Sequence, residues 1–339
     1  MEVGLRSAPA QPKMANVVER GGREGSDVAT RYETKGGVTM ELDDIKRIAV
    51  IGGGVMGHGI AMTCARAGYH TTVVDIKQEL LDNTKNLIEN GPFGLQKQVE
   101  KGRMTQEQAR SITANVHYSL DLAAAVKDAQ FVIEAVTEDV GVKAKVFANV
   151  EEAAPSDAIL ASNTSGIMIT ELSRRLKRKD RMVGMHWFSP AQVMKLIEVV
   201  PGAATSEQTL QTTIELSRKL GKVPIKANDG PGFYTTRFIA NFLAEGILLF
   251  EQGIADIPAI DAMTKLAFGF PMGPFELMDM IGLDTIFHIY EYLHQVTGDS
   301  KYKPPLALRK LYLAGYYGDK RTKPGSAGGW YDYYKIAKG

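Results

Sequence analysis

The sequence is poor in cysteine: Cys64 is the single one among 339 residues, so no disulfide can form within the chain. Such usage is typical of a reducing compartment, and we expect a cytoplasmic protein. No apolar run reaches the length of about 18 residues that a membrane span requires. The formal net charge is +1, which gives no global attraction for nucleic acid or an anionic membrane. No metal site is predicted.

The chain is long enough for about two domains, each with its own core. Residues 1–43 are rich in Gly, Ser and charged side chains without hydrophobic periodicity, and we expect a disordered extension there. Residues 44–228 alternate short apolar runs with helical periods, which predicts a doubly wound, mainly parallel sheet with helices on both faces. Residues 229–339 show helical periods broken by Gly and Pro, which predicts an all-helical domain.

The individual elements follow from the same patterns. Apolar runs predict strands at 48–51, 71–75, 131–136, 158–161, 182–185 and 196–200. Helical periods predict helices at 55–67 and 78–89, a polar helical hairpin through 108, and later helices at 235–252, 257–268, 274–281 and 285–296.

A glycine-rich loop, Gly52-Gly-Gly-Val-Met-Gly57, follows the first strand and opens a helix. Gly52 permits a tight turn, Gly54 lets a pyrophosphate approach the backbone, and Gly57 allows close packing of helix and strand. The free N–H groups of Val55, Met56 and the helix start favour phosphate binding. The loop therefore predicts a dinucleotide site, with a structural turn as the alternative.

Asp75 closes the second strand at the distance expected for the acid that binds the adenosine ribose. A carboxylate there accepts both ribose hydroxyls and repels a 2′-phosphate, so it favours NAD over NADP. The alternative is a solvent-facing Asp that caps the next helix.

His186 follows the strand Met182-Val-Gly-Met185, where the ligand crevice of an open sheet is expected. A histidine there suits acid–base chemistry near pH 7. Glu198 interrupts the apolar run 196–200 and needs a partner if it is buried. If the two strands pair, Glu198 accepts a hydrogen bond from the imidazole and stabilises the imidazolium. The pattern alone leaves a structural His–Glu pair open.

Ser162-Asn-Thr-Ser165 also ends a predicted strand, and these side chains can line the same crevice or form ordinary helix caps. Several motifs then agree in order and spacing with one family. They are the glycine loop, Ala161-Ser-Asn-Thr-Ser165, His186-Trp-Phe-Ser-Pro190, Met194-Lys-Leu-Ile-Glu-Val-Val200, Asp229-Gly-Pro-Gly-Phe233 and Gly269-Phe-Pro-Met-Gly-Pro-Phe-Glu-Leu277. From about Ile45 to Tyr334 the chain resembles the L-3-hydroxyacyl-CoA dehydrogenases.

This resemblance implies reversible, NAD-dependent oxidation of (3S)-3-hydroxyacyl-CoA to 3-oxoacyl-CoA, and a homodimer formed through the helical domain. It makes His186 the general base, Glu198 its carboxylate partner and Ser165 a substrate contact near the nicotinamide. It places Asn163, Glu138 and Lys143 at the NAD site. From the pattern alone, Glu138 and Lys143 instead fit a solvated helix start.

Two positions depart from the family pattern. Thr236 stands where the family often has Asn before Arg237, and Ser189 replaces the Asn of a His-Phe-Phe-Asn-Pro motif. By the same resemblance, Thr236 belongs to the catalytic group and Ser189 to the substrate site. Lys97 and Lys101 in the hairpin are candidates for the coenzyme A phosphates, with a solvated face as the alternative, and Lys323 is a candidate for a cofactor contact.

Other functions stay open at this point. A relative with the same dyad can oxidise a free 3-hydroxy acid or a sugar acid. A non-catalytic NAD-binding protein is a second class, which an intact His186 and Glu198 argue against. A hydroxyacid dehydrogenase with a catalytic lysine in the helical domain is a third, which the His186-Trp-Phe-Ser-Pro190 context disfavours.

Overall fold

The computed structural model describes residues 40–320, 323 and 325–337, so residues 1–39 of the predicted extension lie outside the described part. Packed structure begins by Met40, whose side chain is buried. Its carbonyl oxygen accepts a hydrogen bond from the Thr212 hydroxyl at 2.9 Å. A short 3-10 helix, Leu42–Asp44, then leads into the first strand.

Within the described residues, an eight-stranded sheet has the order β3-β2-β1-β4-β5-β6-β7-β8. Neighbouring strands are parallel except β6 and β7, which are antiparallel. The strands are β1 (Arg47–Ile51), β2 (His70–Val74), β3 (Val116–Ser119), β4 (Phe131–Glu134), β5 (Ile159–Ser162), β6 (Met182–Trp187), β7 (Leu196–Pro201) and β8 (Val223–Lys226).

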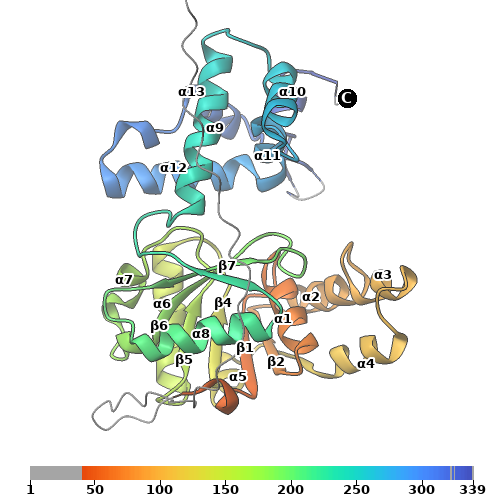
Figure 1. Ribbon diagram of the computed structural model, residues 1–339, viewed down its shortest axis with the longest axis vertical. Helices are drawn as coiled ribbons and strands as arrows, with labels where there is room; N and C mark the ends of the chain where they lie inside the picture. Colours follow the sequence, from red (N-terminus) through yellow and green to blue (C-terminus); the bar gives the residue numbers. More distant parts are fainter. Residues whose placement is uncertain (1–39, 321–322, 324, 338–339) are drawn as a thin grey trace, which may run out of the picture. The chain divides into compact units, whose positions relative to one another are not determined.

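Helices cover both faces of this sheet (Figure 1). Alternate strand residues explain this arrangement, since Ile48 and Val50 pack in one core layer while Ala49 and Ile51 pack in the other. The first layer includes α1 (Gly57–Arg66), α2 (Gln78–Asn90), α4 (Gln106–Ala114) and α8 (Glu207–Lys219); the second includes α5 (Leu122–Val126), α6 (Val140–Ala153) and α7 (Ile169–Leu172). The fold class predicted for this part is confirmed.

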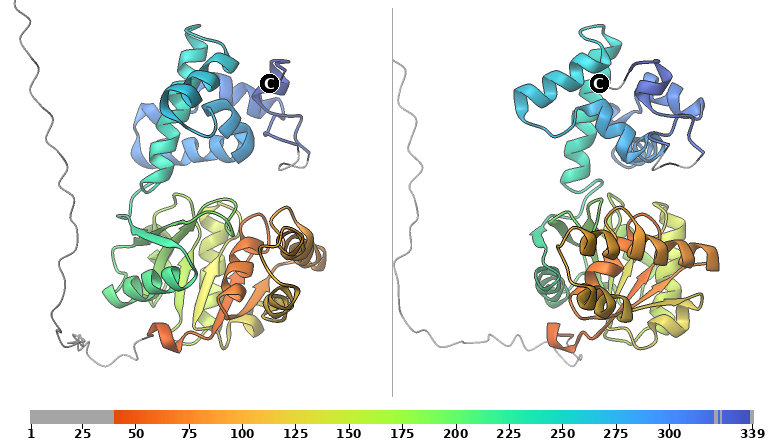
Figure 2. Two further views of the ribbon diagram at one scale, coloured as in Figure 1. Left: turned by 45° about the vertical axis from the view of Figure 1, so that its right-hand side comes forward. Right: turned by 90° about the vertical axis from the view of Figure 1, so that its right-hand side faces the viewer.

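The predicted helical hairpin is present as α3 (Leu95–Glu100) and α4, but α4 runs to Ala114, beyond the predicted end at 108. Its two helices contact each other, α3 contacts α2, and α4 contacts α1, so the hairpin lies along the β2 side of the sheet (Figure 2). A capping box at Thr105 and Gln108 starts α4.

The remaining described residues fold into helices around a separate apolar core. These helices are α9 (Thr235–Glu251), α10 (Ile257–Phe268), α11 (Pro274–Ile281), α12 (Leu283–Thr297), α13 (Leu306–Leu313) and α14 (Trp330–Tyr333). Asp256 caps the start of α10, and Gly269 ends it in the left-handed conformation with φ +69°. No helix among the described residues is long and apolar enough to cross a membrane.

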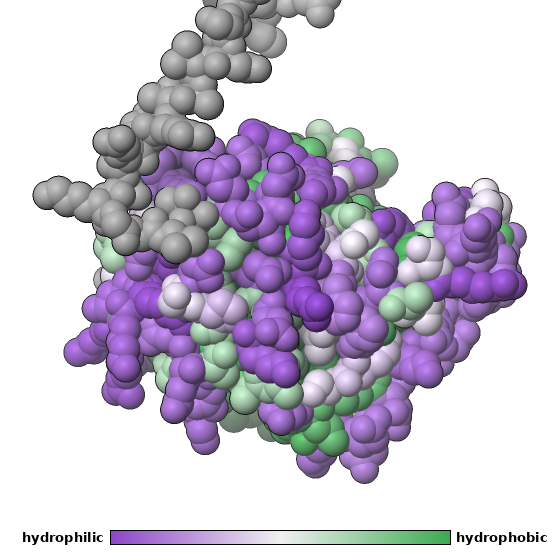
Figure 3. Space-filling model, turned by 90° about the horizontal axis from the view of Figure 1, so that it is seen from below, coloured by the Kyte–Doolittle hydropathy of each residue, from purple (hydrophilic) through white to green (hydrophobic). Residues whose placement is uncertain are grey.

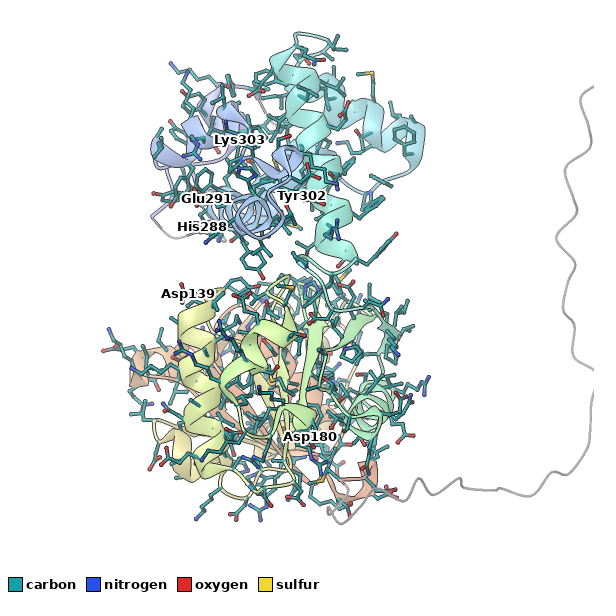
Figure 4. All side chains as sticks on the ribbon, turned by 90° about the vertical axis from the view of Figure 1, so that its left-hand side faces the viewer. Asp139, Asp180, His288, Glu291, Tyr302 and Lys303 are labelled. Atoms are coloured by element: carbon teal, nitrogen blue, oxygen red, sulfur yellow. The ribbon has the colours of Figure 1, made fainter. Side chains whose placement is uncertain are left out.

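The parallel strands β1, β4, β5 and β6 end at one edge of the sheet, where open α/β sheets bind ligands. Asp139 follows β4 and marks this carboxyl edge, and Asp180 precedes β6 and marks the opposite edge (Figure 4). The glycine loop, the 162–165 segment and His186 all lie at or just beyond the carboxyl ends of their strands.

Candidate active site

The glycine loop after β1 has the geometry that its sequence predicts. Gly52 has φ +96°, and an added Cβ there would lie 2.7 Å from the Ala135 carbonyl oxygen. At Gly57 an added Cβ would lie 1.7 Å from the Gly52 oxygen. With any side chain at position 57, the helix could not begin as close to the turn as it does. At Gly54 an added Cβ would meet no atom within 4 Å. This open position next to the start of α1 fits a pyrophosphate.

Asp75 is fixed beside this loop. Its Oδ2 accepts a hydrogen bond from the Gly53 N–H at 2.9 Å, and its Oδ1 accepts one from the Ile76 N–H at 2.8 Å. The buried Thr84 hydroxyl donates to the Gly53 carbonyl oxygen at 2.9 Å and so fixes the loop backbone at Gly53. Sequence reasoning missed Thr84, which carries no recognisable motif.

His186 and Glu198 are brought together by the antiparallel pairing of β6 and β7, where they are direct partners in the register. His186 Nδ1 lies 2.8 Å from Glu198 Oε2, and both side chains are buried. Burial would raise the pKa of the Glu198 carboxyl, but hydrogen bonds from His186 and Thr235 outweigh it and leave this pKa below its usual value. The pairing of the two strands, on which the predicted dyad depended, is therefore present.

Ser165 lies in a segment held by Glu138 and Thr236. Glu138 Oε1 accepts hydrogen bonds from the Thr164 hydroxyl at 2.6 Å and from the Ser165 N–H at 2.8 Å. The Thr236 hydroxyl donates to the Ser165 carbonyl oxygen at 2.6 Å. The Ser165 side chain is half-buried, and its backbone is fixed from two sides.

Glu134 is a site residue that sequence reasoning missed. It is the last residue of β4 and is fully buried. Its Oε1 lies 2.6 Å from the Lys143 ammonium, and its Oε2 accepts from the Ser162 hydroxyl at 2.6 Å. The signal was available, since a carboxylate in the apolar run 131–136 needs a buried partner just as Glu198 does.

These contacts close into a ring of interactions beneath the carboxyl edge of the sheet. Lys143 lies 3.3 Å from Glu138 Oε2 as well, Glu138 accepts from Thr164, and the Ser162 hydroxyl accepts from the Thr164 N–H at 3.2 Å. Lys143 is 1% exposed, so the solvated helix start that the pattern suggested for it is wrong. The ring connects the loop after β4 with the loop after β5.

The comparisons with known proteins agree with this geometry. Residues 47–230 match the family described as "3-hydroxyacyl-CoA dehydrogenase, NAD binding domain", and residues 232–333 match its C-terminal domain. The chain belongs to the 3-hydroxyacyl-CoA dehydrogenase family. NAD is accordingly the cofactor of the domain that carries the glycine loop and Asp75.

Individual relatives cover most of the chain. A probable 3-hydroxybutyryl-CoA dehydrogenase from Bacillus subtilis is 40% identical over 86% of this chain and 98% of its own. The human mitochondrial hydroxyacyl-coenzyme A dehydrogenase is 35% identical over 85% of this chain and 91% of its own. The crystal structure of (S)-3-hydroxybutyryl-CoA dehydrogenase from Ralstonia eutropha has a TM-score of 0.77 and 33% identity, covering 84% of this chain and 99% of its own.

In this 3-hydroxyacyl-CoA dehydrogenase family member, Asn163 is bonded to the residue next to His186, and Ser189 follows His186 in the sequence. Asn163 Oδ1 accepts a hydrogen bond from the N–H of Trp187, the residue after His186, at 2.9 Å. Ser189 is exposed, three residues beyond His186.

The three lysine candidates lie in other surroundings. Lys97 forms an exposed ion pair with Glu100 at 2.9 Å, and Lys101 is exposed at the end of α3. Lys323 lies 2.8 Å from Asp284 and donates to the Thr285 hydroxyl at 2.9 Å, within the helical part of the chain. These contacts connect none of the three lysines to His186.

Proposed function

We propose that this chain oxidises (3S)-3-hydroxyacyl-CoA to 3-oxoacyl-CoA reversibly with NAD, and that His186 is the general base. The observation that carries the proposal is the buried His186–Glu198 pair at the same sheet edge as the glycine loop. A histidine with a buried carboxylate partner is suited to accept a proton near neutral pH.

The direction of the His186 ring defines the proposed chemistry. Because Nδ1 faces Glu198, Nε2 is the nitrogen that takes the proton of the 3-hydroxyl group. The C–O bond becomes a carbonyl as the hydrogen on C3 leaves with its electron pair, for which bound NAD supplies the acceptor. Glu198 offsets the positive charge that His186 gains. The reverse reaction returns the same proton to the substrate oxygen.

The cofactor residues follow from the loop geometry. Gly52, Gly54 and Gly57, with the N–H groups of Val55 and Met56, are proposed to hold the pyrophosphate at the start of α1. Asp75 is proposed to bind the ribose hydroxyls. Glu138, Lys143 and Asn163 are proposed to complete the NAD site, with Lys323 as a further candidate for a cofactor contact.

Ser165 and Ser189 are proposed to contact the substrate, with Thr236 in the catalytic group. Ser165 and Thr236 are joined by a hydrogen bond, and Ser189 is exposed beyond His186. Lys97 and Lys101 carry exposed charges in the hairpin and are proposed to attract the phosphates of coenzyme A. The Lys97–Glu100 pair weakens that role for Lys97, because the glutamate partly neutralises it.

The test is NADH formation from 3-hydroxyacyl-CoA substrates of increasing chain length, with free 3-hydroxybutyrate as the control. We expect activity on the thioesters and little on the free acid. Activity on the free acid alone would overturn the coenzyme A assignment and favour the alternative dehydrogenase of a free hydroxy acid. NAD binding without turnover on any substrate would favour a non-catalytic protein.

We further propose a homodimer formed through the helical domain. Large apolar side chains are exposed on α9, α10 and the segments beside them, namely Phe238, Leu248, Ile254, Met263, Leu266, Phe268 and Phe270. On the face of the α/β domain seen in Figure 3, hydrophilic side chains predominate around smaller hydrophobic patches. An exposed apolar surface of this kind is typical of a protein interface.

We also keep the cytoplasm as the predicted compartment, where the buried Cys64 stays a thiol.

A further inference from the structure

Thr235, the first residue of α9, makes two hydrogen bonds to the carboxylate of Glu198. Its N–H donates to Oε1 at 3.1 Å, and its hydroxyl donates to Oε2 in a short contact. Oε2 is also the oxygen that faces His186 Nδ1. The first turn of a helix in the C-terminal domain therefore contacts the same carboxylate oxygen as the proposed base.

The surroundings of the dyad are otherwise apolar or neutral. The rings of Phe188 and Phe233 lie 4.4 and 6.2 Å from the His186 ring. On the other side of β7, β8 places Ile225 opposite Glu198 in the register. The groups facing the carboxylate are thus the imidazole from β6 and the two neutral donors of Thr235 from α9.

The neighbouring residue shows that this contact belongs to a larger attachment. Thr236 donates its hydroxyl to the Ser165 carbonyl oxygen, so two consecutive threonines bond to two different segments of the α/β domain. Successive helical side chains point about 100° apart, which allows one helix start to reach both segments. The start of α9 is bonded to the β7 carboxylate and to the loop after β5.

We propose that Thr235 is a positioning residue for the reaction, which orients Glu198 toward His186 and sets how strongly that carboxylate attracts the imidazole proton. This role rests on the proposed function of His186 as the base. A hydrogen bond to an anionic oxygen disperses part of its negative charge. Each donor from Thr235 consequently weakens the pull of Glu198 on the imidazolium and restricts the rotation of the carboxylate.

The consequence of losing the hydroxyl has a defined sign. Without it, Oε2 keeps more negative charge beside Nδ1, and the imidazolium becomes more stable. His186 is then protonated more readily, and the acid limb of the kcat/KM profile for oxidation moves to higher pH. A role in packing alone would lower activity without moving this limb.

The test uses Thr235→Val, which replaces the hydroxyl by a methyl group of similar size, in the full chain. We expect the acid limb of kcat/KM to move up by roughly 0.5 to 1 pH unit and kcat to fall about three- to tenfold. Thr235→Ser keeps the hydroxyl and should restore both values. Thr264→Val is the matched control, because the buried Thr264 hydroxyl bonds only within α10, to the Ile260 carbonyl at 2.9 Å.

An acid limb unchanged in Thr235→Val, with a loss of activity no greater than in Thr264→Val, would overturn the proposal. If Thr235→Val does not fold, Thr235→Ala provides the same comparison with less bulk. An NMR titration of His186 in the wild type and the folded variant, assigned with His186→Gln, needs no turnover. Equal His186 pKa values there would contradict the role of Thr235, whereas absent activity on acyl-CoA substrates would contradict only the proposed function.

Discussion

Lys143 and Glu134 form an ion pair with 2.6 Å between Nζ and Oε1, and both side chains are buried. The pair lies where the loop after β4 turns toward the glycine loop, and the Val136 N–H also donates to Glu134 at 2.7 Å. Through Ser162 and Thr164 the same carboxylate is connected to the Ser165 segment. The cofactor side and the substrate side of the proposed site therefore share one buried network.

We expect Glu134→Gln to destabilise the protein strongly, because it leaves the Lys143 charge buried with a weaker partner. Removing one member of a buried pair typically costs about 3–5 kcal/mol. Urea unfolding measures this loss, and a higher KM for NAD should accompany it in the folded fraction. Glu100→Gln, which breaks the exposed Lys97 pair, is the control and should cost under about 1 kcal/mol. Equal stabilities of the two variants would contradict the prediction that the buried ion pair of Glu134 stabilises the fold.

The comparison of Glu134 with Glu198 shows what sequence can reveal about the site. Both carboxylates interrupt apolar strands, and both are buried. The role of Glu198 was predicted because the strand before it carries His186, a recognisable partner. The partner of Glu134 is Lys143, nine residues later on α6. Thr235 was missed because a threonine at a helix start has many uses. Side chains on different helices and strands meet because of strand register and helix packing. The hydrophobic periodicity of a sequence does not define either of these.

His186→Gln should lower kcat by about two to four orders of magnitude, because glutamine cannot accept the hydroxyl proton. NAD binding should be retained, since the glycine loop and Asp75 are untouched. Steady-state kinetics with a 3-hydroxyacyl-CoA and a fluorescence titration with NADH measure the two effects. His288→Gln is the control, because His288 is exposed on α12 beside Glu291 (Figure 4). Near-normal turnover in His186→Gln with NAD bound would refute the assignment.

The fold was predicted well where apolar periodicity was strong. The helices predicted at 257–268 and 274–281 have those bounds, and the strands that carry the glycine loop and the dyad are present. The edge strands β3 and β8 were missed. All four residues of β8 are at least partly exposed, and β3 has Val116 as its one buried side chain, so neither shows the apolar run of a central strand.

Lys222 supplies a prediction on stability at alkaline pH. Its ammonium donates to the carbonyl oxygens of Ala191 and Met194, which follow the His186 strand, at 2.6 and 2.8 Å. Burial, with the charges of Lys195 and Arg66, lowers the pKa of Lys222 to about 8. In the unfolded chain this lysine has its ordinary pKa of 10.5. Between about pH 8 and pH 10.5, the unfolded chain therefore binds a proton that the folded chain lacks. Lys222 therefore makes stability rise with pH in that window.

The measurement is urea unfolding of the wild type and Lys222→Met at about pH 7 and about pH 10. The wild type should gain stability relative to the variant as the pH rises. Lys226→Met removes an exposed lysine from β8 and should show no such trend. A wild-type minus Lys222→Met difference that stays constant between the two pH values would contradict the prediction.

Leu266→Glu should dissociate the proposed dimer. Leu266 is 87% exposed on α10, which packs against α9, and the nearby rings of Phe268 and Phe270 lie 6.3 Å apart. A charge placed within a covered apolar surface loses its water without gaining a partner, so we expect the dimer Kd to rise at least about 100-fold. Sedimentation velocity across a concentration series measures this change. Leu313→Glu is the matched control, because Leu313 is 74% exposed at the end of α13, away from the proposed interface residues in sequence. A dimer that persists in Leu266→Glu, or that Leu313→Glu dissociates equally, would place the interface elsewhere.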